Sequence, residues 1–73
     1  MSQRLRLTVN GESREYAPDA FPASVLELIQ SLELDAGMVV AEVNGDIVRR
    51  QGFADRVLDD GDTVELVRFV GGG

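Results

Sequence analysis

The 73-residue chain contains no cysteine, histidine, lysine or tryptophan. The absence of cysteine excludes a disulfide, a thiolate metal site and a cysteine nucleophile. The absence of histidine removes the commonest general base and metal ligand of proteins. Without lysine, no side-chain amine can accept an isopeptide bond, so the chain cannot build side-chain-linked polymers of itself. A chain this short also has little volume for a deep pocket, and we do not expect an enzyme in its own right.

The charge balance disfavours several partners. The chain has thirteen acidic residues and seven arginines, which gives a net charge of −6. Such a chain repels phosphate backbones and anionic membrane surfaces, so we expect neither nucleic acid nor membrane as a partner. Residues 1–10 are polar and alternating, unlike a signal peptide, and no apolar run approaches the ~20 residues of a membrane span. We therefore expect a cytoplasmic protein.

The N-terminal pattern predicts a hairpin. Leu5, Leu7 and Val9 alternate with polar residues, which is typical of a half-buried strand. The dipeptide Asn10-Gly11 follows and is the strongest short hairpin signal, because both turn positions tolerate a positive φ. Residues 12–16 then form the returning strand, which is mostly polar and is expected at a sheet edge.

A helix is predicted after the loop at 17–23. Ser24 is a good N-cap, and Glu27 three residues later completes a capping box. The apolar residues that follow recur at i, i+3, i+4 and i+7, which is one face of a helix: Val25, Leu28, Ile29 and Leu32. Gly37 is the predicted stop.

The second half of the chain predicts three further strands. They lie at residues 38–43, 47–48 and 63–70, with an Asn-Gly turn at 44–45. The irregular segment 49–58 is expected to reach the core through Phe53, Val57 and Leu58. A cluster at Asp59, Asp60 and Asp62 allows two interpretations, a calcium site or a tight turn. It lacks the spacing and the final glutamate of a calcium loop, which favours the turn.

This order of elements predicts an α+β fold of the β-grasp (ubiquitin-like) type. We expect a mixed four- to five-stranded sheet with one main helix packed on one face, and with the first and last strands parallel at its centre. The domain is predicted over residues 1–70, followed by a flexible glycine tail at 71–73. The predicted core consists of Leu5, Leu7, Val25, Leu28, Ile29, Leu32, Val39, Val43, Val64 and Leu66.

The end of the chain carries the sharpest functional signal. Gly71, Gly72 and Gly73 offer no side chain to pack, so they form either a frayed remnant or a tail that threads a narrow channel in a partner enzyme. In the second interpretation the carboxylate of Gly73 is presented to ATP. Val67 and Phe69 fall on the side of the last strand opposite Val64 and Leu66, and are predicted to dock a partner.

Several segments resemble the ThiS family, the sulfur carriers of thiamine thiazole biosynthesis. They read Asn-Gly-Asp-Ile-Val at 44–48, Asp-Gly-Asp-Thr-Val-Glu-Leu-Val at 60–67 and, most specifically, Arg-Phe-Val-Gly-Gly-Gly at 68–73. Ser24-Val25 with Leu28-Ile29 is similar to the start of the family's helix. One departure is Arg49, which occupies a position where the family often has proline.

The resemblance implies a chemical cycle. A ubiquitin-activating-like (ThiF-like) adenylyltransferase would use ATP and Mg to adenylate the Gly73 carboxylate. A persulfide supplied by a cysteine desulfurase would then displace AMP and leave a covalent thiocarboxylate on Gly73, which a ThiG-like thiazole synthase would consume. The chain would bind no cofactor or metal and supply no catalytic residue of its own. Its tail, Gly71 and Gly72, and its docking residues Val67, Arg68, Phe69 and Val70 would orient the reaction.

Other functions stay open on the sequence alone. Molybdopterin-type (MoaD-like) carriers share the fold and the Gly-Gly end, but their tails more often read Pro-Pro-Val-Ala-Gly-Gly than the Arg68-Phe69-Val70 ending found here. Carriers for cysteine, methionine or tRNA sulfur pathways are further possibilities. From a different class, a ubiquitin-like protein modifier or a passive interaction module would use the same fold without sulfur chemistry.

Overall fold

The computed structural model describes residues 3–69 as a five-stranded sheet with one α-helix. The strands are β1 (Leu5–Val9), β2 (Glu12–Tyr16), β3 (Val39–Val43), β4 (Asp46–Val48) and β5 (Thr63–Arg68), the helix is α1 (Val25–Ser31), and the 3₁₀ turns are η1 (Pro18–Ala20), η2 (Ala36–Met38) and η3 (Arg50–Gly52). The strand order is β2-β1-β5-β3-β4, with β1 and β5 parallel and the other neighbours antiparallel. This topology confirms the predicted β-grasp fold.

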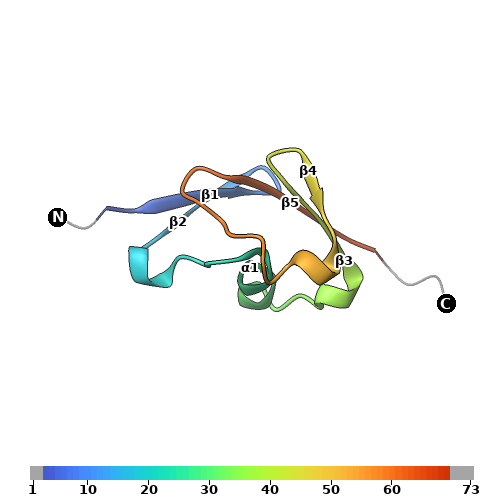
Figure 1. Ribbon diagram of the computed structural model, residues 1–73. Coiled ribbons are helices and arrows are strands. Elements are labelled where there is room, and N and C mark those ends of the chain that lie inside the picture. Colours follow the sequence, from blue (N-terminus) through green and yellow to red (C-terminus); the bar gives the residue numbers. More distant parts are fainter. Residues whose placement is uncertain (1–2, 70–73) are drawn as a thin grey trace.

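The core lies between the sheet and the helical segments, which all cover the same face (Figure 1). Twelve hydrophobic residues are buried there: Leu7, Val9, Val25, Leu28, Ile29, Val39, Ala41, Val43, Phe53, Leu58, Val64 and Leu66. Leu5 and Leu32, predicted to be buried, are half-buried. No helix within residues 3–69 is long and apolar enough to cross a membrane.

The prediction that Val57 anchors the segment 49–58 is wrong, because its side chain is 58% exposed. The backbone here is extended and pairs with the start of α1: Val25 N donates to Arg56 O at 3.0 Å, and Leu58 N donates to Ala23 O at 3.1 Å. Successive side chains of extended backbone point to opposite sides. Burial of Leu58 therefore turns Val57 outward.

Helix α1 begins as predicted but ends earlier. Ser24 Oγ accepts from Glu27 N at 3.2 Å, while the Glu27 carboxylate accepts from Ala23 N at 3.1 Å. The prediction of Gly37 as the stop is wrong, because α1 ends at Ser31 and Gly37 lies in η2. Glu33 takes the left-handed conformation with φ +60°, and Leu34 N donates back to Ile29 O at 3.2 Å. This is a Schellman ending in which glutamate occupies the position where glycine is usual.

Both Asn-Gly turns have positive φ at both residues, as hairpin turns of this type require. Each asparagine also bonds to the backbone of β5. Asn10 Oδ1 accepts from Leu66 N at 2.7 Å, and Asn44 Oδ1 accepts from Thr63 N at 2.9 Å. The two turns therefore clamp the central strand from both neighbouring hairpins.

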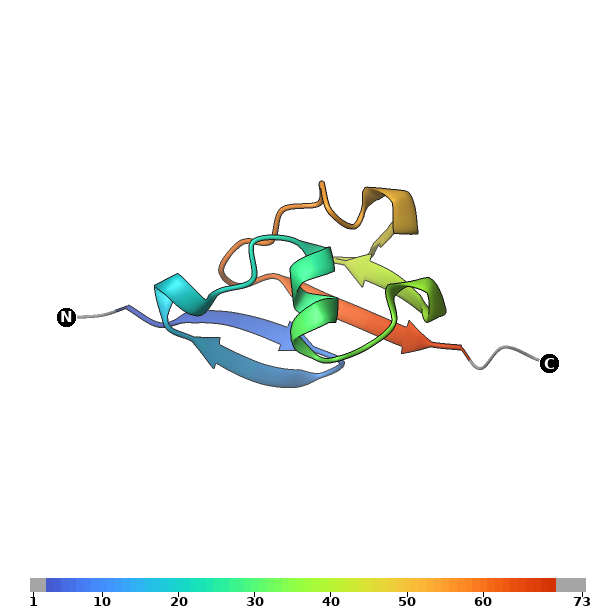
Figure 2. The ribbon, with the colours of Figure 1, turned by 90° about the horizontal axis from the view of Figure 1, so that it is seen from below.

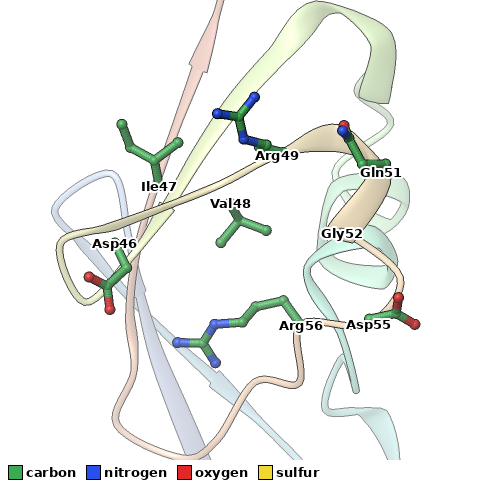
Figure 3. Close-up of a pocket in the computed structure, with 8 residues that line it drawn as sticks. All are labelled: Asp46, Ile47, Val48, Arg49, Gln51, Gly52, Asp55 and Arg56. Atoms are coloured by element: carbon green, nitrogen blue, oxygen red, sulfur yellow. The ribbon is translucent and has the colours of Figure 1, made fainter.

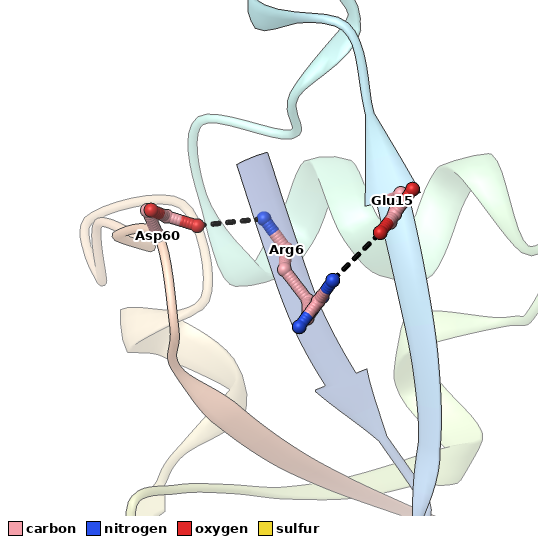
Figure 4. A network of polar contacts seen from close by, with 3 residues as sticks. All are labelled: Arg6, Glu15 and Asp60. Atoms are coloured by element: carbon pink, nitrogen blue, oxygen red, sulfur yellow. Dashed lines mark hydrogen bonds and ion pairs between the residues drawn. The ribbon is translucent and has the colours of Figure 1, made fainter. Parts of the chain in front are cut away.

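The aspartate cluster forms a hydrogen-bonded turn. The Asp62 carboxylate accepts from Asn44 Nδ2 at 2.9 Å and from Asp59 N at 2.8 Å. Asp60 accepts from Arg6 N at 2.7 Å, which ties the turn to β1 (Figure 4). These bonds support the tight-turn interpretation of the cluster.

The Arg6 side chain reaches across to β2 in the same network (Figure 4). Its guanidinium pairs with the Glu15 carboxylate at 2.7 Å. The hydrogen bond and the charge of Arg6 lower the pKa of Glu15 below its ordinary value. Both side chains are exposed, so this pair adds little stability.

We expect Leu28→Ala to lower the free energy of unfolding by about 2–5 kcal/mol, because it opens a cavity under the sheet. Leu28 is fully buried at the centre of α1. Urea unfolding followed by circular dichroism measures the loss. Gln30→Ala, at an exposed position of the same helix, is the control and should change stability little. Equal stabilities of the two variants would contradict the helix register.

We expect Asn10→Gly to lower the free energy of unfolding by about 1–2 kcal/mol, because the part-buried Leu66 N–H loses its acceptor. Glycine still permits the positive φ of the turn. Asn10→Asp keeps a carbonyl-type oxygen in place and should lose less. Hydrogen exchange of the Leu66 amide should accelerate selectively in Asn10→Gly. Unchanged exchange there would show that the clamp contributes nothing.

Candidate functional site

The central strand β5 leads directly to the glycine end of the sequence. It lies between β1 and β3, and it runs through the middle of the sheet toward the C-terminal end of the molecule (Figure 2). Phe69 N donates to Met38 O at 3.0 Å, which fixes the chain one residue beyond β5. The predicted roles of Val70, Gly71, Gly72 and Gly73 fall outside the described residues.

The face of the sheet opposite α1 carries an apolar pair near this end. Val67 is 60% exposed, as predicted, and lies opposite Val40, which is 44% exposed. Val40 was not among the predicted docking residues. Its signal was present in the sequence, because Val40 alternates with the buried Val39 and Ala41 and so had to face outward. The two valines form one apolar spot on β3 and β5.

Phe69 and Arg68 border a hollow of about 390 Å³ beside the end of β5. The loop after α1 supplies the rest of its lining, namely Glu33, Leu34, Asp35 and Met38. Phe69 is 46% exposed. The structure thus brings Arg68 and Phe69 together at this hollow, while Val67 belongs to the open sheet face. Sequence reasoning missed Leu34 and Met38. Because α1 ends at Ser31, earlier than predicted, the loop that carries these two residues lies beside the end of β5.

A larger hollow of about 510 Å³ lies elsewhere, between β4 and η3 (Figure 3). Arg49, Asp55 and Arg56 are among its lining residues. Figure 3 shows Arg49 and Asp55 pointing away from each other, and Arg56 pointing toward the side of Asp46. Arg56 also donates to the carbonyl of Val57 at 2.8 Å. These polar groups do not converge on one point, so the hollow offers no arrangement for acid–base or nucleophilic chemistry.

Comparison with known proteins places these features in a family. The model of the ThiS family matches residues 7–73. The sulfur carrier protein ThiS of Bacillus subtilis is 31% identical over 67 residues, which cover 92% of this chain and 98% of that protein. A thiazole synthase of Paramagnetospirillum magneticum is 35% identical over 69 residues, or 94% of this chain. The chain spans only 20% of the length of that synthase.

Solved structures agree with these sequence matches. The crystal structure of a thiamine biosynthesis protein (ThiS) from Geobacter metallireducens superposes with a TM-score of 0.77 at 37% identity, covering 94% of this chain and all of that one. A solution structure of a thiamine biosynthesis protein from the same organism gives a TM-score of 0.75, covering 94% of this chain and 88% of that one. The family model, the sequence relatives and the solved structures each match nearly the whole chain. The chain therefore belongs to the ThiS family.

Proposed function

We propose that this chain is a sulfur carrier of thiamine biosynthesis and that the α-carboxylate of Gly73 holds the sulfur. The observation that carries the proposal is the family match over residues 7–73, which includes the glycine end. The geometry is compatible with it, because β5, the strand that precedes that end in the sequence, is the central strand of the sheet. A partner enzyme would then receive a narrow segment from a fixed direction.

In the proposed cycle, a ThiF-like adenylyltransferase activates the carboxylate. A Gly73 oxygen attacks the α-phosphorus of Mg-bound ATP, and pyrophosphate leaves. The terminal sulfur of a persulfide then attacks the acyl carbon and expels AMP. A thiol of the sulfur donor cleaves the resulting S–S bond, which leaves a thiocarboxylate on Gly73 and a disulfide on the donor. Activation is required because a carboxylate oxygen is a poor leaving group.

The carrier's own residues contribute orientation in this scheme. Gly73 is four positions beyond Phe69, and an extended chain spans about 3.3 Å per residue, so the acyl carbon lies at most about 13 Å from the anchored Phe69. In the proposed cycle, the acid–base and metal chemistry belongs to the partner enzymes.

The match to a thiazole synthase supports the thiamine branch over the molybdopterin branch. A segment of that synthase resembles 94% of this chain. We infer that a ThiG-like thiazole synthase receives the sulfur. A protein modifier remains the alternative from another class, and it would leave amide bonds to lysines of other proteins instead of a thiocarboxylate.

We expect the protein to gain the mass of one sulfur minus one oxygen when it is incubated with the adenylyltransferase, ATP, Mg and a persulfide donor. Intact-mass spectrometry measures the gain, and fragmentation should place it on Gly73. A variant that lacks Gly73 is the control and should form neither adenylate nor thiocarboxylate. Equal activation of that variant, or sulfur at any other residue, contradicts the proposal.

We also expect the apolar residues beside the end of β5 to dock a partner. Phe69→Ala and Val67→Ala should each weaken binding of the adenylyltransferase or the thiazole synthase by about fivefold, since central apolar contacts dominate interfaces. Val57→Ala is a matched control for Val67, because both valines are about equally exposed, at 58% and 60%. Isothermal titration calorimetry measures the affinities. If all three variants bind both enzymes like the wild type, these residues are ordinary surface.

A further inference from the structure

The open face of the sheet carries two like charges on neighbouring strands. Glu42 of β3 and Glu65 of β5 lie directly opposite each other in the strand register, on the face away from α1. Like charges in this position destabilise a sheet. Within residues 3–69 neither carboxylate takes part in an ion pair, whereas Arg6 and Glu15 on the same face neutralise each other at 2.7 Å. In the part of the chain that the structure describes, no cation is paired with these carboxylates of β3 and β5.

Apolar side chains border this carboxylate pair. The next outward pair toward the end of β5 is Val40 with Val67. On the other side of Glu42 lies Ile47 of β4, which is 71% exposed. The surface thus combines two negative charges with a rim of exposed aliphatic groups. A long cationic side chain fits such a surface, because its charged head meets the carboxylates while its aliphatic stem packs on the rim.

We propose that Glu42 and Glu65 form a seat for an arginine or lysine side chain of the adenylyltransferase, whose neighbouring apolar residue rests on Val40 and Val67. This inference rests on the proposed function. The repulsion between the two carboxylates in the free carrier is relieved when the cation enters. The two carboxylates therefore lower the stability of the isolated domain and raise its affinity for the adenylyltransferase.

The position of the seat favours the adenylyltransferase as its partner. Gly73 is six positions beyond Val67, so the enzyme surface that covers Val67 lies within about 20 Å of the point where ATP reacts. An enzyme that binds the phosphates of ATP concentrates positive charge around that site. The carrier has a net charge of −6, and opposite charges on the two surfaces also accelerate their encounter.

The test compares Glu42→Gln, Glu65→Gln and the double variant with wild type. Each single variant should melt about 1–4 °C higher, because it removes a like-charge pair. Each should nevertheless bind the ThiF-like adenylyltransferase about tenfold more weakly at low ionic strength. The difference should shrink in high salt, which screens the attraction. Because the variants are expected to gain stability, unfolding cannot account for their weaker binding.

Glu12→Gln is the matched control. It makes the same charge change at an exposed position of β2, opposite Val9 and so on the other face of the sheet. Its affinity should stay within about twofold of wild type, since only the general attraction between the proteins changes. If Glu12→Gln weakens binding as much as Glu65→Gln, net charge alone acts and the seat is refuted.

Two further outcomes overturn the inference. One is wild-type affinity of both glutamine variants for the adenylyltransferase. The other is a loss of affinity only for the thiazole synthase, which would assign the face to that enzyme instead. Intact mass separates these results from failure of the proposed function. If wild type gains sulfur on Gly73 while the variants bind normally, only the seat is wrong, and if wild type gains none, the sulfur-carrier proposal itself fails.

Discussion

The parallel pairing of β1 with β5 is the contact on which the rest of the structure depends. It joins the first strand of the chain to the last, and the hairpins to which β1 and β3 belong are assembled on the two sides of β5. Only two residue pairs of β1 and β5 are in register, so side chains reinforce the junction. Asn10 extends the pairing beyond the end of β1, and Asp60 ties the turn before β5 to Arg6.

This junction lets one strand serve two purposes. The residues of β5 that face α1, Val64 and Leu66, are buried in the core. The residues between and after them, Glu65 and Val67, stand on the open face. Any partner that touches the open face therefore contacts β5, whose position is fixed by pairing with both β1 and β3.

Periodicity and turn chemistry were sufficient to predict the topology, the two Asn-Gly turns, the start of α1 and most of the core. These patterns gave wrong predictions for the end of the helix and for the direction of one side chain. Glu33 ends the helix in a conformation normally left to glycine, so the search for glycine pointed to Gly37. Val57 is as hydrophobic as the core residues, so its residue type suggested burial. Its outward direction follows from the pairing of its backbone with the start of α1, which the sequence does not reveal. The pairing of Glu42 with Glu65 depends on the register between β3 and β5, which pattern alone does not specify.

The stagger of the two parallel strands separates the ends of the domain. Leu5 lies three residues before the pair Thr8–Thr63, and Arg68 lies five residues after it. At about 3.3 Å per residue, these positions are about 26 Å apart along the sheet, and β1 begins on the side of the molecule opposite to where β5 ends (Figures 1 and 2). A fluorophore, an affinity handle or a whole second protein joined ahead of β1 would therefore stand clear of the end of β5, and a partner could approach that end of the sheet while the domain is tethered at the other.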